Sequence, residues 1–108
     1  MILYHSTTTP INEFRIKGNC GYGVYFASAK KYSQTFGDIT YRVKLTPNNT
    51  LIFNDNEVRG KGFFNMSELQ FNDYIKAGYD SLAWYRKGKL AEFIALTTDI
   101  IIDKNLMY

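Results

Sequence analysis

The segment ITYRVKL at residues 39–45 alternates strictly between apolar and polar side chains. Ile39, Tyr41, Val43 and Leu45 fall on one face, and Thr40, Arg42 and Lys44 fall on the other. Because successive side chains of a strand point to opposite faces, this pattern predicts a half-buried β-strand. The apolar face of such a strand needs a second layer to cover it, so the chain is not expected to fold as helices alone.

Further short extended segments occur along the chain, with two helical patterns between them. Ala29, Tyr32 and Phe36 are spaced as one face of a helix over residues 29–36, with Ser28 as N-cap and Gly37 as a stop. The S-x-x-Q capping box at residues 67–70 predicts a second helix that runs to about residue 77 and ends at a glycine. The other predicted strands are residues 1–5, 21–27, 51–53, 79–86, 90–96 and 100–103, and residues 54–65 are predicted to be a loop.

This order of elements predicts an α+β fold. Too few helices alternate with strands for a parallel α/β sheet, and the RKGK turn at residues 86–89 predicts an antiparallel hairpin. We therefore expect a largely antiparallel sheet, or a pair of sheets, with two short helices. The 108 residues, with a mass of 12.5 kDa, are expected to form one domain spanning residues 1–108.

Composition excludes several classes of function. The single cysteine rules out an internal disulfide or a cysteine-based zinc site, and the single histidine rules out an HExxH metal site, so no metal is expected. No apolar run approaches the roughly 18 residues of a membrane span, and residues 1–20 show no secretory signal pattern. We expect a cytoplasmic protein, acting in its own cell or in an invaded one, with no membrane partner. The net charge of +3 permits contact with nucleic acid without requiring it.

Three polar residues occupy strand positions that would otherwise be apolar. His5 ends the first predicted strand, and Tyr25 lies in the middle of GYGVYFA. Glu92 shares a strand face with Ile94 and Leu96, where a carboxylate costs free energy unless it has partners. Such a carboxylate is a candidate functional group.

These residues and their spacing resemble the H-Y-E class of ADP-ribosyltransferases, which includes the poly(ADP-ribose) polymerases and the diphtheria-toxin type. The family's histidine falls on His5 in HST, its tyrosine on Tyr25 in GYGVYFA, and its glutamate on Glu92 in EFIAL. A serine eight residues after the tyrosine and an aromatic eleven residues after it match Ser33 and Phe36. GYDSLAW at residues 78–84 also resembles a strand common in bacterial and phage members. The resemblance covers the whole chain and implies the family's split, mostly antiparallel two-sheet core.

The resemblance implies a mono-ADP-ribosyltransferase that cleaves NAD⁺ between nicotinamide and ribose and modifies a macromolecule, as a bacterial or phage effector, toxin or anti-defence protein. Glu92 is expected to stabilise the positive charge that develops on the ribose. Tyr25 and Phe36 are expected to clamp the nicotinamide ring, and His5 to orient a ribose hydroxyl. The carboxamide is expected to contact the Ser33 hydroxyl and the backbone near Ser6 and Thr7 in HST. The cation for the pyrophosphate stays open among Arg15, Lys17, Lys30 and Lys31.

The chain departs from the family at two positions. Ser6 replaces the glycine that follows the histidine in the polymerases, although a backbone contact survives this change. Leu90 removes the E/Q-x-E pair of the arginine-specific members, which makes arginine a less favoured acceptor. Two other hypotheses remain beside the protein-directed enzyme. One is an inactive protein-interaction module of the same fold, and the other is an ADP-ribosyltransferase that modifies DNA or RNA.

Overall fold

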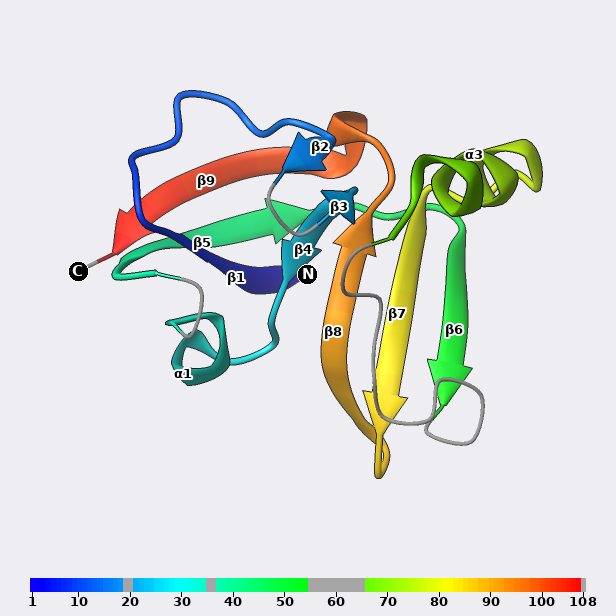
Figure 1. Cartoon of the computed structure of the whole chain (residues 1–108). Coiled ribbons are helices and arrows are strands. Elements are labelled where there is room, and N and C mark those ends of the chain that lie inside the picture. Colours follow the sequence, from blue (N-terminus) through cyan, green and yellow to red (C-terminus); the bar gives the residue numbers. More distant parts are fainter. Residues whose placement is uncertain (19–20, 35–36, 55–65, 108) are drawn as a thin grey trace.

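The computed structural model describes residues 1–18, 21–34, 37–54 and 66–107, and within them it forms two β-sheets (Figure 1). The first is antiparallel, in the order β1 (Ile2–Thr7), β5 (Ile39–Leu45) and β9 (Ile101–Met107). The second has the order β4 (Val24–Phe26), β8 (Lys89–Ala95), β7 (Ser81–Arg86) and β6 (Thr50–Asn54). Only β6 and β7 run parallel in this sheet. The strands of the two sheets cross at a large angle.

Within the described residues, one isolated β-bridge joins the two sheets, between Tyr4 of β1 and Ala27, the residue that follows β4. Tyr4 and Ala27 exchange two backbone hydrogen bonds, each 2.9 Å long. Beyond this pair, β1 continues in the three-stranded sheet and β4 in the four-stranded sheet, so the two sheets separate at this point. A two-stranded ribbon, β2 (Lys17–Gly18) and β3 (Gly21–Tyr22), precedes β4.

Two short α-helices and a 3-10 helix, η2 (Thr98–Ile100), complete the described fold. The four-residue α1 (Lys30–Ser33) packs beside β1. The nine-residue α3 (Glu68–Lys76) lies in the chain between the parallel strands β6 and β7. Ser67 and Gln70 form the predicted capping box, and Gly78, with a φ of 94°, follows the C-cap. None of the described helices is long and apolar enough to cross a membrane.

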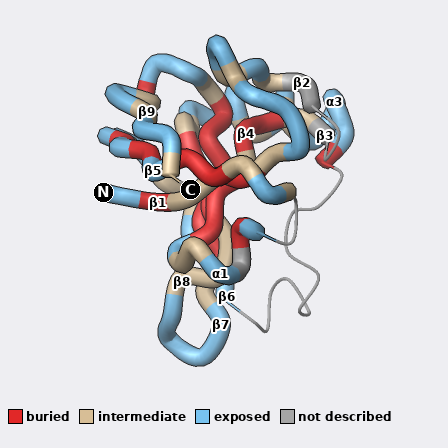
Figure 2. Tube along the Cα trace, turned by 90° about the vertical axis from the view of Figure 1, so that its left-hand side faces the viewer, coloured by how far each residue is buried: buried red, intermediate tan, exposed pale blue. Residues whose placement is uncertain are grey.

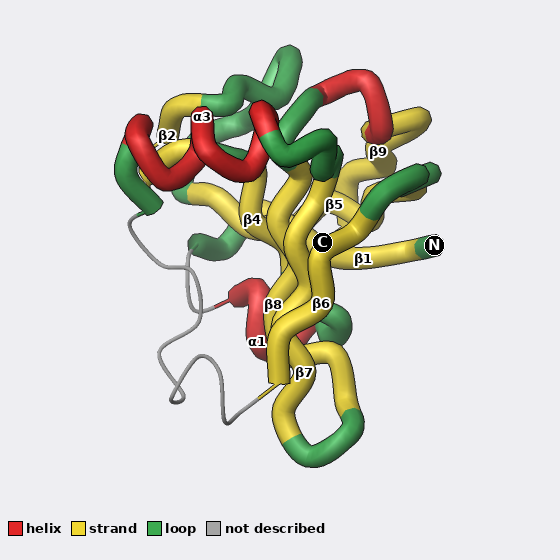
Figure 3. Tube along the Cα trace, turned by 90° about the vertical axis from the view of Figure 1, so that its right-hand side faces the viewer, coloured by secondary structure: helices red, strands yellow, loops and turns green. Residues whose placement is uncertain are grey.

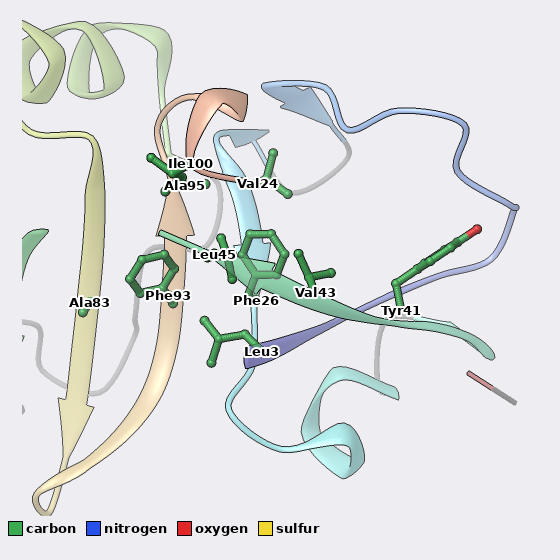
Figure 4. Close-up of a cluster of buried hydrophobic side chains, with 10 residues drawn as sticks. All are labelled: Leu3, Val24, Phe26, Tyr41, Val43, Leu45, Ala83, Phe93, Ala95 and Ile100. Atoms are coloured by element: carbon green, nitrogen blue, oxygen red, sulfur yellow. The ribbon is translucent and has the colours of Figure 1, made fainter. Parts of the chain in front are cut away.

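The main core fills the angle between the two sheets (Figure 4). Val43 and Leu45 of β5 are fully buried against Phe26 of β4 and Phe93 of β8. Figure 2 shows the buried segments gathered at this junction, while the outer loops and turns are exposed. Alternation within each strand therefore directs one apolar face of each sheet into a shared interior.

A second, smaller core lies on the opposite face of the β4–β8–β7–β6 sheet. Met66, Leu82, Ile94 and Leu96 are buried there. Figure 3 shows α3 lying across one end of this sheet, where Phe71 and Tyr74 of the helix pack against the cluster. The helix itself has no fully buried residue, so its contribution is a partial cover.

The structure confirms the predicted α+β fold with mostly antiparallel sheets and two short helices. Several details differ from the sequence-based expectation, and the predicted strand over residues 21–27 is divided into β3 and β4, which belong to different sheets. The first helix spans only Lys30–Ser33, and the last strand extends to Met107 because β5 offers it a full-length partner. Thr40, predicted to face solvent, is fully buried because it pairs with Ser6 beneath α1. The predicted loop at residues 54–65 lies almost wholly outside the described residues.

Candidate functional site

His5 and Tyr25, two of the three residues that the sequence singled out, are in direct contact. His5 lies on β1 just beyond the bridge between the sheets, and its Nδ1 atom is 2.6 Å from the main-chain oxygen of Tyr25. A carbonyl oxygen can only accept a hydrogen bond, so Nδ1 carries the proton in the neutral ring. The lone pair of the neutral imidazole is therefore on Nε2, which no protein group bonds within the described ranges.

The His5 ring packs edge-on against two aromatic rings. Its centroid lies 5.2 Å from that of Phe14 and 5.7 Å from that of Phe26. The two phenylalanine rings are themselves 5.9 Å apart, so the three rings form a small cluster. These contacts, together with the hydrogen bond to Tyr25, leave the imidazole little freedom to rotate.

Burial lowers the pKa of His5 below its usual value near 6.5. The hydrogen bond to the Tyr25 carbonyl acts in the opposite direction, because it stabilises the protonated ring, but it is the smaller effect. His5 is consequently neutral at pH 7, and the neutral ring presents Nε2 as an acceptor.

Tyr25 connects this histidine to the second core. Its ring packs on the cluster that contains Ile94, the residue directly opposite it on β8. Its hydroxyl accepts a hydrogen bond of 3.2 Å from the main-chain nitrogen of Met66. Tyr25 is therefore held at its main-chain oxygen by His5 and at its hydroxyl by Met66.

Glu92 lies on the same face of the same sheet as the Tyr25 ring. It is two residues from Ile94 along β8, so the two-residue period of a strand places both side chains on one face. Glu92 is half-buried and directly opposite Trp84 on β7, next to a register shift between Trp84 and Tyr85. The alternation that suggested Glu92 as a candidate is thus present in the fold.

Ser33 is directed into the protein. Only 2% of the residue is exposed, and its hydroxyl donates to the main-chain oxygen of Lys30 at 2.8 Å. Its oxygen also lies 2.8 Å from the Ser6 hydroxyl, which contacts Thr40 at the same distance. This chain of three buried hydroxyls joins α1 to β1 and β5. Because the hydroxyl proton of Ser33 is used in the hydrogen bond to the Lys30 carbonyl, Ser33 has no second proton to donate to a ligand.

The remaining predicted residues are spread around this centre. Thr7 is half-buried at the end of β1, where its main chain packs against Gly37. Arg15 and Lys31 are exposed, and Lys30 is half-buried on α1. Phe36, predicted to clamp a ring with Tyr25, lies outside the described residues, as does the side chain of Lys17.

The sequence pattern singles out neither Phe14 nor Trp84 as a site residue. Phe14 follows an irregular, polar stretch, so no periodic pattern marks it as a partner of His5. Trp84 is 6% exposed, and among the described residues no group accepts a hydrogen bond from its indole nitrogen. The guanidinium carbon of Arg86 lies 4.9 Å from the centre of its ring. Trp84 lies opposite Glu92 because of the register of the β7–β8 hairpin. The RKGK turn in the sequence predicts the hairpin but not this register.

Comparisons with known proteins connect the chain to a solved structure but to no family. No family model matches the chain, and no curated protein matches its sequence. Among solved structures, the crystal structure of an anti-CRISPR protein is similar, with a TM-score of 0.58 and 17% sequence identity. The match covers 99% of this chain and 95% of the other. At this identity the match indicates a shared fold.

Proposed function

We propose that this protein is an NAD⁺-dependent mono-ADP-ribosyltransferase that modifies a macromolecular target. The observation that carries the proposal is the hydrogen bond from His5 to the Tyr25 main chain. It joins two of the three residues of the H-Y-E pattern where the sheets split, and Glu92, the third, shares a sheet face with the Tyr25 ring.

In this proposal Glu92 acts on the ribose of NAD⁺. Cleavage of the bond between nicotinamide and ribose releases a neutral ring and leaves positive charge on the sugar. An ionised carboxylate near the sugar stabilises that charge and accepts a hydrogen bond from a ribose hydroxyl. The half-buried position of Glu92 supports this role, because a partly desolvated carboxylate interacts more strongly with a nearby cation than an exposed one does.

His5 is proposed to orient the substrate. Because Nδ1 donates to Tyr25, the neutral ring offers only an acceptor at Nε2, which suits a ribose hydroxyl. The ring is held by Phe14 and Phe26, so little rotational entropy is lost when the hydroxyl binds. In this proposal the histidine supplies no proton for the leaving nicotinamide.

Ser33 needs a different role from the one the resemblance implies. Its proton is used by the Lys30 carbonyl, and the residue is almost fully buried. We propose that it anchors α1 to β1 through Ser6, so that the carboxamide of NAD⁺ is bound by backbone groups beside it.

The target is proposed to belong to a bacterial defence system. The support is the fold shared with an anti-CRISPR protein, over nearly the whole length of both chains. A small protein encoded by an invading element could inactivate such a system with few molecules if each molecule modified many targets. NAD⁺ is then the substrate and a protein or nucleic acid of the host is the acceptor.

One set of contacts favours a second candidate, an interaction module without turnover. The Tyr25 hydroxyl accepts from Met66, and the Ser33 hydroxyl is bonded to Lys30 and Ser6. Both side chains therefore have structural functions that need no ligand. In that case the protein would inhibit by occupying a surface of its partner.

Incubation with radiolabelled NAD⁺ and purified CRISPR effector complexes or bacterial lysate separates the two candidates. The transferase predicts label on a macromolecule together with stoichiometric free nicotinamide, and the loss of both in Glu92→Gln. An inhibitor that works by binding alone predicts stable complex formation, no nicotinamide release, and the same inhibition by Glu92→Gln as by the wild type. Nuclease treatment of the labelled product distinguishes a nucleic-acid acceptor from a protein acceptor.

A further inference from the structure

A groove with a volume of about 340 Å³ lies beside β9, and its described lining does not include Glu92. Residues 12–14 form one wall, and residues 98 and 101–104 form the other. The groove is within the usual size range of binding pockets, roughly 300–1,000 Å³. The H-Y-E pattern assigns nothing to it.

The groove follows the edge of a sheet. β9 is the outer strand of the order β1-β5-β9, so only its β5 side is paired within the described sheet. Four consecutive residues of this strand, 101–104, line the groove. The groove borders this outer strand from its irregular start, where the register shifts opposite Lys44 and Leu45, to residue 104. Such an edge presents unpaired N–H and C=O groups that an added strand can bond.

The lining combines exposed apolar surface with negative charge. Ile102 is 55% exposed, and Leu106 further along the same strand is 51% exposed. Glu13 and Asp103 are exposed carboxylates on opposite walls. The ammonium group of Lys104 donates to the main-chain oxygen of Asn12 at 3.0 Å, so the one cation among the described lining residues is directed to the loop. The groove is therefore acidic in a chain whose net charge is +3.

We infer that this groove binds an extended segment of a partner protein, which adds to β9 as a further strand. The segment carries lysine or arginine at positions that face Glu13 and Asp103, with β-branched or apolar side chains over Ile102. Main-chain hydrogen bonds supply affinity, and the two carboxylates select basic sequences. Nucleic acid is disfavoured here because the same carboxylates repel phosphates.

Phe14 connects the groove to the candidate active site. Phe14 is one of the residues that line the groove, and the centre of its ring lies 5.2 Å from the centre of the His5 ring. A segment bound along β9 thus lies beside the wall that holds the histidine. The inference does not rest on NAD⁺ chemistry, since strand addition needs neither Glu92 nor turnover.

The test uses the full chain, labelled with ¹⁵N, and a capped nine-residue peptide in which lysine alternates with valine and threonine. We expect saturable shifts of the amide resonances of residues 101–107. Strand addition also predicts at least tenfold slower hydrogen exchange at alternate amides of β9, those that point away from β5. A matched peptide with glutamate in place of lysine should bind at least tenfold more weakly.

Charge reversal provides the matched variants. The double variant Glu13→Lys/Asp103→Lys should bind the lysine peptide at least tenfold more weakly and favour the glutamate peptide, while its melting temperature shows that it is folded. Asp73→Lys, an exposed position on α3, makes the same type of charge change away from the groove and should bind like the wild type.

Three results would overturn the inference: equal binding of the two peptides, no change in exchange along β9, or concentration-dependent protection of β9 without peptide, which would assign the edge to a second copy of the chain. Because the assay contains no NAD⁺, failure of the transferase proposal would leave its outcome unchanged.

Discussion

The Nδ1 atom of His5 lies 2.6 Å from the main-chain oxygen of Tyr25. This side-chain bond ties β1 to β4 next to the Tyr4–Ala27 bridge, at the point where the two sheets meet. The contact therefore has a structural consequence whether or not a substrate binds. It also fixes the tautomer of the His5 ring, with the proton on Nδ1 and the lone pair on Nε2. The effect of Nδ1 on protein stability and the effect of Nε2 on substrate binding can therefore be measured separately.

The first prediction concerns stability against pH. Burial lowers the pKa of His5 in the folded protein, whereas the unfolded chain keeps a value near 6.5. Below about pH 6.5 the unfolded state therefore binds more protons, so the free energy of unfolding falls as the pH drops. We expect urea midpoints to decrease from pH 7.5 to pH 5.5, and His5→Asn to show a smaller decrease over the same interval.

His5 is the single histidine of the chain, so no other histidine titrates between pH 5.5 and pH 7.5. His5→Asn has a lower stability at every pH, and the comparison therefore uses the slope against pH and not the absolute value. Parallel slopes for the two proteins would show that His5 does not take up a proton preferentially in the unfolded state.

The second prediction concerns Glu92. Replacement by glutamine keeps the shape of the side chain and removes its charge, so binding of NAD⁺ should persist while turnover falls by about 10²–10³-fold. Trp84, the single tryptophan, lies opposite Glu92 on β7, and its fluorescence should respond to bound NAD⁺. Fluorescence titration then gives the dissociation constant, and nicotinamide release gives the rate. Wild-type turnover by the glutamine variant would remove Glu92 from the mechanism.

The third prediction separates two roles of Ser33. If its hydroxyl serves only the Lys30–Ser33–Ser6 contacts, Ser33→Ala should cost roughly 1 kcal/mol of stability, the usual value of a hydrogen bond, and leave the affinity for NAD⁺ unchanged. A direct bond to the carboxamide would instead raise the dissociation constant several-fold. Thermal unfolding and the fluorescence titration measure these two quantities on the same samples.

Most of the fold could be predicted from local patterns. The alternation over residues 39–45 gave β5 with the same bounds, because one face of that strand is buried along its length. The capping box at Ser67 gave the start of α3, because the bond that defines it is local in sequence. What local patterns could not give was the burial of Thr40, which depends on Ser6 and Ser33 from two other elements.

The candidate site was predictable to the same extent. Polar groups on apolar strands need partners, and this rule makes His5, Tyr25 and Glu92 candidate site residues. The structure brings the first two into contact. The packing of Phe14 on His5 depends on the path of an irregular loop across the core, which no periodicity records. The groove along β9 depends on strand order, which brings together two ends of the chain, and strand order cannot be read from any one segment.

The last prediction concerns Gly23, immediately before β4. Its φ is +98°, and a Cβ atom built there would lie 2.5 Å from the Cγ2 atom of Ile94 and 3.4 Å from the main-chain oxygen of Ala95. Gly88, in the hairpin turn, has a φ of +77° with nothing within 4 Å of its Cβ position. Both alanine variants pay about 1–2 kcal/mol for the left-handed backbone, and only Gly23→Ala adds a clash with a buried side chain. Gly23→Ala should therefore be less stable than Gly88→Ala by about 1–3 kcal/mol in urea unfolding, and equal losses would mean that Ile94 can move aside without cost. Because Ile94 is the partner of Tyr25 across the ladder, Gly23→Ala should also weaken the fluorescence response to NAD⁺, whereas Gly88→Ala should leave it intact.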